Sequence, residues 1–245
     1  MEDFCDMEDK KSMKRVLLKL SGEALSGEKK TGFDDDVCRE VARQVKILSD
    51  EGTEIGIVIG GGNFWRGRTG GGIDRTKSDQ IGMLATVMNC IYVSEIFRSF
   101  GIKTAVLTPF ECGSFTKLFS KDRANKYFAH GMVCFFAGGT GHPYFSTDMC
   151  MALRAVEIGA DCILGAKAVD GVYDSDPGKN PDAKKFDSLT FGEIVEKKLG
   201  VIDLAASVMC MENNMPMILF GLGEKDSIIN AAHGQTIGTV VKAQI

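Results

Sequence analysis

The chain has 245 residues, of which 44% are hydrophobic and 25% are charged, and its formal net charge is −4. The length suits one large α/β domain, or one domain with a small lobe, with a core large enough to need no disulfide staples. Because the basic residues are not massed in one block, the charge gives no sign of nucleic-acid binding, and an anionic ligand must be held by local chemistry.

The N-terminal residues 1–13 are predicted to be a disordered tail, followed by a single domain over residues 14–245. The tail is acidic and has no apolar centre, so it is neither a secretory signal nor a membrane span, and Met13 is an alternative start. The longest weakly polar stretch, residues 81–93, is too short to cross a bilayer. We therefore expect no membrane association.

From residue 15 onward, short apolar runs alternate with helical patterns. The predicted strands are continuous apolar runs, as expected of strands buried on both faces, at residues 15–20, 54–60, 103–108, 132–138, 161–167 and 215–220. The predicted helices are residues 34–49, 78–100, 147–159 and 191–199. This alternation predicts an α/β fold, a three-layer α/β/α sandwich with a mostly parallel central sheet.

The predicted helix 78–100 is apolar on all sides, which indicates burial either in the core or at a subunit interface. The eight cysteines form no C-x-x-C pair, and most of them lie in apolar stretches, where cysteine acts as a small hydrophobic residue. The three histidines are scattered without ligand spacing, so no zinc site is expected. Reduced thiols in a cytoplasm are the simplest interpretation.

Four glycine-bearing loops follow predicted strands, and in a parallel sheet such loops meet at one edge, where ligands bind. In the first, Lys19 precedes Ser21 and Gly22 at a strand end. This lysine can reach a phosphate as a point charge, or extend to solvent at the strand end. Gly22 and Gly27 have the spacing of a Walker loop, but Glu28 replaces the required lysine, which excludes a P-loop enzyme.

The second loop contains three consecutive glycines, residues 60–62, whose N–H groups can form an anion nest, although a tight turn explains them equally well. Arg66 adds a guanidinium fork that can bind a phosphate. The spacing departs from the dinucleotide pattern G-x-G-x-x-G, which argues against an oxidoreductase of that kind.

The third loop, residues 137–148, places hydroxyl groups and backbone donors at the start of a helix, where they suit an anion or a uracil edge, or simply cap the helix. The fourth loop contains Tyr173, whose ring offers a flat face for a nucleobase, and Asp176, which suits a ribose or a cation. A hairpin with Asx turns is the alternative for this loop. Residues 173–187 are expected to form an exposed loop or a hairpin.

The motifs KRVLLKLSGEAL, VIGGGNFWRG, SDQIGMLATVMN, GGTGHPYFSTD, ALRAVEIGAD, VDGVYDSDP and LAASVMCMENNMP resemble the amino-acid-kinase family, and within it the bacterial uridylate kinases. They are spread from residue 14 to the C-terminal part of the chain. The string IGMLATVMN is what separates the uridylate kinases from relatives that act on carbamate, aspartate, glutamate or acetylglutamate. The resemblance implies phosphoryl transfer from ATP, with Mg²⁺, to UMP in pyrimidine nucleotide biosynthesis.

The resemblance also implies roles for individual residues. ATP is expected to contact Lys19, Leu20, Ser21, Gly22, Gly62, Arg66, Lys167, Tyr173 and Asp176. UMP is expected to contact Gly61, Asp79, Thr140, Gly141, His142, Pro143, Tyr144, Phe145, Ser146 and Thr147. The catalytic residues implied are Lys19, Arg66 and Asp148. Asp148 is expected to orient lysine side chains or metal-bound waters and not to act as a base.

The resemblance also implies a cytoplasmic homohexamer that GTP activates and UTP inhibits. In two places, however, the sequence departs from the family pattern. The family often has a lysine at the position of Gly165, and we expect Lys167 to supply that charge instead. Residues 110–131 match the family less well, so no residue role is carried over there.

Two other functions are possible for a protein that resembles this family. One is a kinase of the same fold that makes an acyl phosphate, and the other is a related storage protein that holds molybdenum oxoanions.

Overall fold

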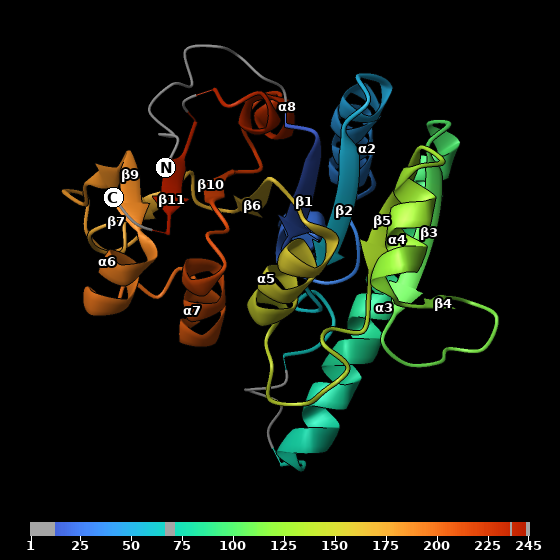
Figure 1. The fold of residues 1–245 in the computed structure, drawn as a ribbon. Helices are drawn as coiled ribbons and strands as arrows, with labels where there is room; N and C mark the ends of the chain where they lie inside the picture. The colour runs from blue at the N-terminus through green and yellow to red at the C-terminus, as the bar shows by residue number, and fades with distance from the viewer. Residues whose placement is uncertain (1–12, 67–71, 236, 244–245) are drawn as a thin grey trace.

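The computed structural model describes residues 13–66, 72–235 and 237–243. A nine-stranded sheet lies between layers of helices (Figure 1). Its strands are β1 Arg15–Leu20, β2 Glu54–Ile59, β3 Lys103–Thr108, β4 Lys117–Leu118, β5 Met132–Phe136, β6 Cys162–Lys167, β9 Ser188–Thr190, β10 Met217–Gly221 and β11 Thr239–Lys242. A separate hairpin pairs β7 Val172–Tyr173 with β8 Lys185–Phe186. The helices are α1 Gly22–Leu25, α2 Asp35–Asp50, α3 Arg75–Ser99, α4 Lys121–Phe128, α5 Thr147–Ile158, α6 Phe191–Glu196, α7 Leu204–Glu212 and α8 Ser227–Ala232, with a 3₁₀ turn at Gly27–Lys29.

The strand order of the sheet is β4-β3-β5-β2-β1-β6-β10-β11-β9. Every described pairing in it is parallel except that of β10 with β11. The four central strands β5, β2, β1 and β6 therefore end side by side at one edge. The loops that leave this edge are brought together by the sheet, which is where an open α/β fold binds its ligands.

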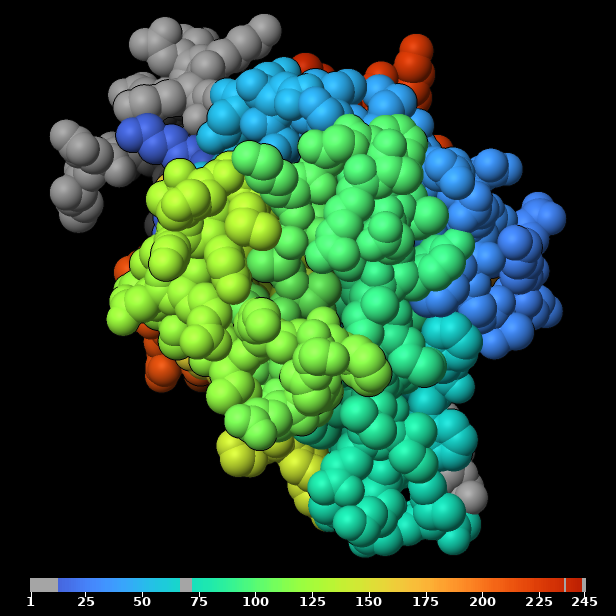
Figure 2. Space-filling model, turned by 90° about the vertical axis from the view of Figure 1, so that its right-hand side faces the viewer, coloured from blue at the N-terminus to red at the C-terminus, as the bar shows by residue number. Residues whose placement is uncertain are grey.

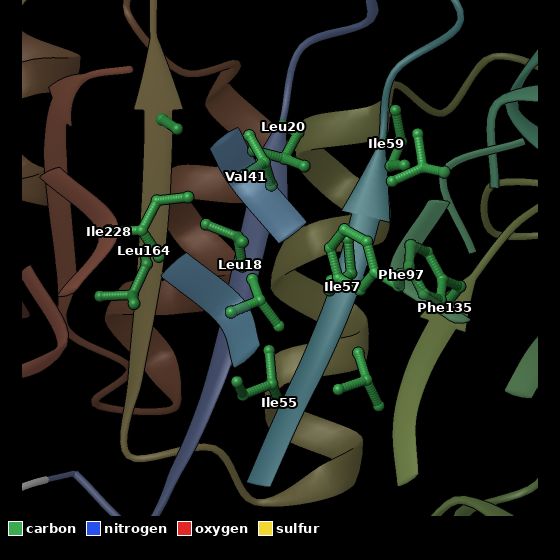
Figure 3. Packing of buried hydrophobic residues seen from close by; sticks show 14 of the residues in the cluster. Leu18, Leu20, Val41, Ile55, Ile57, Ile59, Phe97, Phe135, Leu164 and Ile228 are labelled. Carbon is green, nitrogen blue, oxygen red and sulfur yellow. The ribbon is translucent and has the colours of Figure 1, made fainter. Parts of the chain in front are cut away.

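Helices cover both faces of the sheet, and this is why its strands are apolar on both sides. Leu18 and Leu20 of β1 pack with α2, α3 and α8, whereas Leu17 packs with α5 and its neighbouring helices α4, α6 and α7. Figure 3 shows the first of these layers through the buried side chains Leu18, Leu20, Val41, Ile55, Ile57, Ile59, Phe97, Phe135, Leu164 and Ile228. The predicted three-layer α/β/α fold with a mostly parallel sheet is confirmed.

The predicted elements that are long and strongly apolar agree with the structure. Strands β1 and β3 have the predicted bounds, and the ends of β2, β5, β6 and β10 differ from the predictions by one or two residues. Helix α3 begins earlier than predicted, because Asp74 caps it by accepting the N–H of Lys77. Of the two alternatives for residues 173–187, the hairpin forms, with β7 and β8 as its strands. Helices α4, α7 and α8 and strands β4, β9 and β11 were not predicted, since such short elements depend on tertiary packing.

Of the predicted tail, residues 1–12 lie outside the described residues, and Met13 packs against the core. Six of the seven described cysteines are buried, as their apolar sequence surroundings indicated. By length and composition α3 qualifies as a membrane span, but 44% of its most apolar segment is buried, and core helices meet the same test. Its first turns project beyond the rest of the molecule (Figures 1 and 2).

Candidate active site

Two cavities adjoin at the carboxyl ends of the central strands. The first has a volume of about 500 Å³ and lies between the glycine loop after β2 and the start of α5. The second has a volume of about 580 Å³ and lies between the end of β6, the β7–β8 hairpin and residues 197–201. Lys19 near the end of β1, Ser21 just after it and Glu23 in α1 line both cavities. A group bound in one cavity is therefore placed next to a group bound in the other.

A carboxylate between two lysines occupies the junction of the cavities. Asp148 lies in the first turn of α5, and its Oδ1 is 3.0 Å from Nζ of Lys19. Burial raises the pKa of the Asp148 carboxyl, but the positive charges of Lys19 and Lys167 outweigh burial and hold the pKa below its usual value. Asp148 therefore stays ionised and is not placed to act as an acid or a base near neutral pH.

Lys167, the last residue of β6, completes this cluster. Burial lowers its pKa, the charge of Lys19 lowers it further, and Asp148 opposes both. Its Nζ donates a hydrogen bond to the carbonyl of Val201. The lysine is thus held at the wall of the second cavity, close to the Asp148 carboxylate.

Packing explains why position 165 is glycine here and the predicted positive charge comes from Lys167. A Cβ at Gly165 would lie 2.5 Å from Cδ2 of Leu219 on the neighbouring strand β10, so Leu219 fills the space of a side chain there. Residues two apart on a strand point to the same face. A lysine at position 167 therefore leaves the sheet on the same side, one step closer to the loop edge.

Asp203 joins the start of α5 to the start of α7. Its side chain caps α7 by accepting the N–H of Ala206, and it also accepts a hydrogen bond from the Ser146 hydroxyl. Its backbone N–H also helps to lower the pKa of the Asp148 carboxyl. Sequence analysis missed this residue. The string Asp-Leu-Ala-Ala contains the cap signal, but the contact with α5 depends on the packing of α5 against α7.

One face of α3 holds both glycine loops. Asn89 is fully buried, and its Nδ2 donates to the carbonyl of Gly60 at 2.7 Å and to Oδ1 of Asn63 at 2.7 Å. Thr86 accepts the N–H of Gly138 at 2.8 Å. A Cβ at Gly22 would lie 2.4 Å from Oδ1 of Asn63, so only glycine fits where the chain leaves β1. These buried contacts fix the loop amides before any ligand arrives.

The structure places most of the predicted site residues around the two cavities. The first is lined by Lys19, Ser21, Gly22, Gly61, Gly62, Arg66, Asp79, Phe145, Ser146, Thr147 and Asp148. The second is lined by Lys19, Ser21, Lys167, Tyr173 and Asp176. Gly62 and Arg66, which were expected to face ATP, lie in the cavity that also contains the expected UMP contacts.

Other predicted residues line neither cavity, namely Leu20, Thr140, Gly141, His142, Pro143 and Tyr144. The side chain of Leu20 is fully buried in the core, so only its backbone is near the site. Residues that sequence analysis missed also line the first cavity, among them Glu23, Trp65, Arg75, Met83 and Thr86. Glu23 forms an ion pair with the largely exposed Arg66.

The described residues contain no group of three His, Cys, Asp or Glu side chains placed to hold a metal ion. The carboxylate at the junction is already held by lysines, so a divalent cation here would have to be bound chiefly by phosphate oxygens of a ligand.

Comparison with known proteins identifies one matching family model and several similar kinase structures. The model of the amino acid kinase family matches residues 14–221. The UMP kinase of Bacillus anthracis is 33% identical, with a TM-score of 0.91 over 96% of this chain and 98% of that one. The UMP kinase of Ureaplasma parvum is 33% identical, with a TM-score of 0.88 over 94% and 98%. The uridylate kinase of Archaeoglobus fulgidus is 28% identical, with a TM-score of 0.73 over 92% and 99%.

Proposed function

Because this chain belongs to the amino acid kinase family, we propose that it is a UMP kinase, which transfers the terminal phosphoryl group of ATP to UMP and forms UDP and ADP. The observation that carries this proposal is the pair of adjoining cavities that meet at Lys19, Asp148 and Lys167. Two nucleotides can then present their phosphates to one positively charged junction. The first cavity is the acceptor site and the second is the donor site.

The chemistry of this transfer needs positioning more than it needs covalent help. The bond between the γ-phosphorus of ATP and the β–γ bridging oxygen breaks, and a bond forms to a phosphate oxygen of UMP. That oxygen is already ionised near neutral pH, so no base has to remove a proton. What the protein contributes is an in-line arrangement and positive charge where negative charge moves.

The residues at the junction match that requirement. Lys19 lines both cavities and can neutralise charge on the phosphoryl group as it passes between them. Lys167 lines only the donor cavity and can neutralise charge on the leaving ADP. Asp148, ionised between them, orients the two ammonium groups and keeps these like charges close together. The glycine-loop amides supply further donors.

Mg²⁺ is expected to enter with ATP, bound to its phosphate oxygens. Magnesium usually keeps several waters and takes few protein ligands in kinases, which fits a site without a carboxylate cluster among the described residues. When bound, it offsets part of the charge on the β- and γ-phosphates.

The test of the function is a coupled assay of ADP release with Mg-ATP, in which UMP, CMP, acetylglutamate and aspartate are offered separately, with and without GTP. Turnover with UMP and not with the two amino acids is the expected result. Turnover only with an amino acid would instead indicate a kinase that makes an acyl phosphate. Absence of any turnover, together with bound metal in the purified protein, would indicate oxoanion storage.

The surface of α3 supports the proposal that the enzyme assembles into a homohexamer. Ile81, Leu84, Met88 and Ile91 recur at helical spacing along one face, and each of these side chains is at least 40% exposed. The opposite face holds the glycine loops, so the described residues of the single chain leave an apolar stripe uncovered. Such a stripe is typical of a contact between copies.

Replacing both Leu84 and Met88 by glutamate is expected to split the assembly, because each copy would bury unpaired carboxylates in an apolar contact. The dissociation constant should rise by a factor of at least about 100. Light scattering coupled to gel filtration measures this as a smaller particle. Ala205→Glu adds charge at an exposed position of another helix, α7, and should leave the mass unchanged. Wild-type protein that runs as a monomer would contradict the assembly itself.

The resemblance to the uridylate kinases is the basis for the remaining parts of the proposal. We expect GTP to activate the enzyme, UTP to inhibit it, and the reaction to serve pyrimidine nucleotide biosynthesis in the cytoplasm. The free thiols of the seven described cysteines are compatible with a reducing compartment.

A further inference from the structure

A residue in an unfavourable backbone conformation precedes Phe145, which lines the acceptor cavity. Tyr144 has a φ of 73°, a left-handed conformation that side chains with a Cβ adopt rarely. Tyr144 is 64% exposed, so burial of its side chain does not explain the conformation. Its N–H, however, donates to Oδ2 of Asp79 at 2.8 Å. The loop before α5 is thus tied at this point to the second turn of α3.

Asp79 receives a second contact on the same oxygen. Nε of Arg75, one turn earlier on α3, donates to Oδ2 at 2.8 Å. The guanidinium of Arg75 also lies over the ring of Tyr144, with its central carbon 5.3 Å from the ring centroid. Arg75, Asp79 and Tyr144 therefore form a closed set, called the clamp below, in which each member contacts the other two.

The clamp leaves the second carboxylate oxygen of Asp79 unused by the described part of the chain, since both hydrogen bonds go to Oδ2. The Asp79 side chain is only 13% exposed, and it lines the acceptor cavity together with Arg75. A carboxylate oxygen held in this way accepts hydrogen bonds and cannot donate them. Its natural partner in a nucleotide is a sugar hydroxyl, because phosphate oxygens would be repelled.

We propose that Arg75 is a positioning residue of the acceptor site, which fixes the Asp79 carboxylate so that Oδ1 recognises a ribose hydroxyl of the acceptor nucleotide. This inference rests on the proposed function. Arg75 acts through Asp79 in two ways. Its charge-assisted hydrogen bond to Oδ2 sets the orientation of the carboxylate, and its contact with Tyr144 keeps the loop closed over the same oxygen. Arg75 thereby determines selectivity for ribonucleotides.

The experiment compares three acceptors in wild-type enzyme and variants: UMP, dUMP and 3′-deoxy-UMP. In Arg75→Gln we expect kcat/KM for UMP to fall roughly 10- to 150-fold, the factor that corresponds to a lost hydrogen bond between charged groups. We expect kcat/KM for the analogue that lacks the recognised hydroxyl to change less than about threefold, since that analogue does not use the contact. KM for ATP should stay constant. Arg75→Lys should recover part of the selectivity.

A double-mutant cycle separates positioning from a direct role. In an Asp79→Asn background, Arg75→Gln should cause almost no further loss of selectivity, because the group through which Arg75 acts is already changed. The matched control is Lys77→Gln. It removes one positive charge from the same first turns of α3 at an exposed side chain outside the cavity, and it should leave all three kinetic ratios unchanged.

Three results would overturn the inference. One is unchanged kinetics with UMP in Arg75→Gln. Another is an equal fall for UMP and both deoxy analogues, which would make Arg75 only an anchor of the loop. The third is additive loss of selectivity in the double mutant. Wild-type enzyme that neither phosphorylates UMP nor binds it in a calorimeter would overturn the proposed function, and this inference with it. In contrast, active wild-type enzyme with parallel losses in the variant would overturn the inference alone.

Discussion

Replacing Lys19 by methionine is expected to lower kcat for UMP phosphorylation roughly 10²- to 10³-fold, the effect of losing one preorganised donor to the transition state. Lys19 lines both cavities, so its charge lies where the phosphoryl group passes. The same substitution leaves Asp148 without its closest cation, at a side chain only 22% exposed. Because methionine fills most of the volume of the lysine side chain, a change in activity would come from the lost charge and not from lost packing.

The measurement is steady-state kinetics with both substrates varied. Because the contact is stronger in the transition state than in the ground state, kcat should fall far more than KM for UMP rises. The matched control is Lys14→Met, which removes a lysine just before β1, at the opposite end of the strand. That control should remain within about twofold of wild type. Near-native turnover of Lys19→Met would remove this lysine from the mechanism.

Replacing Lys167 by methionine is expected to lower kcat about 100-fold, with KM for UMP nearly unchanged, because this lysine lines only the donor cavity. Lys184→Met is the matched control, since Lys184 lies in the β7–β8 hairpin outside both cavities. A fall in kcat/KM for UMP with no change in kcat would instead place Lys167 in substrate binding only.

The pH profile gives an independent check on Lys167. Burial lowers the pKa of its ammonium group, and the nearby Lys19 lowers it further, although Asp148 opposes both effects. The charged form is the active one, so activity should fall as the pH rises through this lowered pKa, earlier than for an ordinary lysine. In Lys167→Arg the guanidinium stays charged, and the alkaline fall should move to higher pH. An identical alkaline limb in the two proteins would contradict this role.

The two lysines are not independent, because both face Asp148. Removing one of the two lysines weakens the attraction that holds the carboxylate ionised and leaves the carboxylate to interact with the other lysine alone of this pair. The losses in Lys19→Met and Lys167→Met should therefore not multiply in the double variant. A full double-mutant cycle would measure this coupling.

Much of the site could be predicted because its signals are local. Lys19 was predicted at a strand end, and hydroxyl groups were predicted at the start of a helix, where Ser146 caps α5 by accepting the N–H of Met149. Asp148, which the resemblance implied as a catalytic residue, lies in the first turn of the same helix. The contacts that join these residues could not be predicted. Asp203 and Val201 reach α5 and Lys167 only because α7 packs beside α5.

The role of Arg75 illustrates the same limit. Arg75 and Asp79 are four residues apart on a helix, so their ion pair is available to sequence reasoning. The helix was predicted to begin only at residue 78, however, and the Tyr144 N–H that completes the clamp comes from a distant loop. The exposed apolar stripe of α3 could not be predicted either. This helix is apolar on all sides, and only its packing against the sheet shows which side stays exposed.

The sequence by itself determined the alternation of buried strands with helices, the glycine turns at the strand ends and the family to which the chain belongs. These depend on hydrophobic periodicity and on turn and cap chemistry, which act between residues close in the chain. The tertiary structure decided which turns share a cavity, why Leu219 leaves room only for glycine at position 165, and how Asp148 comes to lie between Lys19 and Lys167. Those features follow from the order of strands in the sheet, which brings together side chains from distant parts of the sequence.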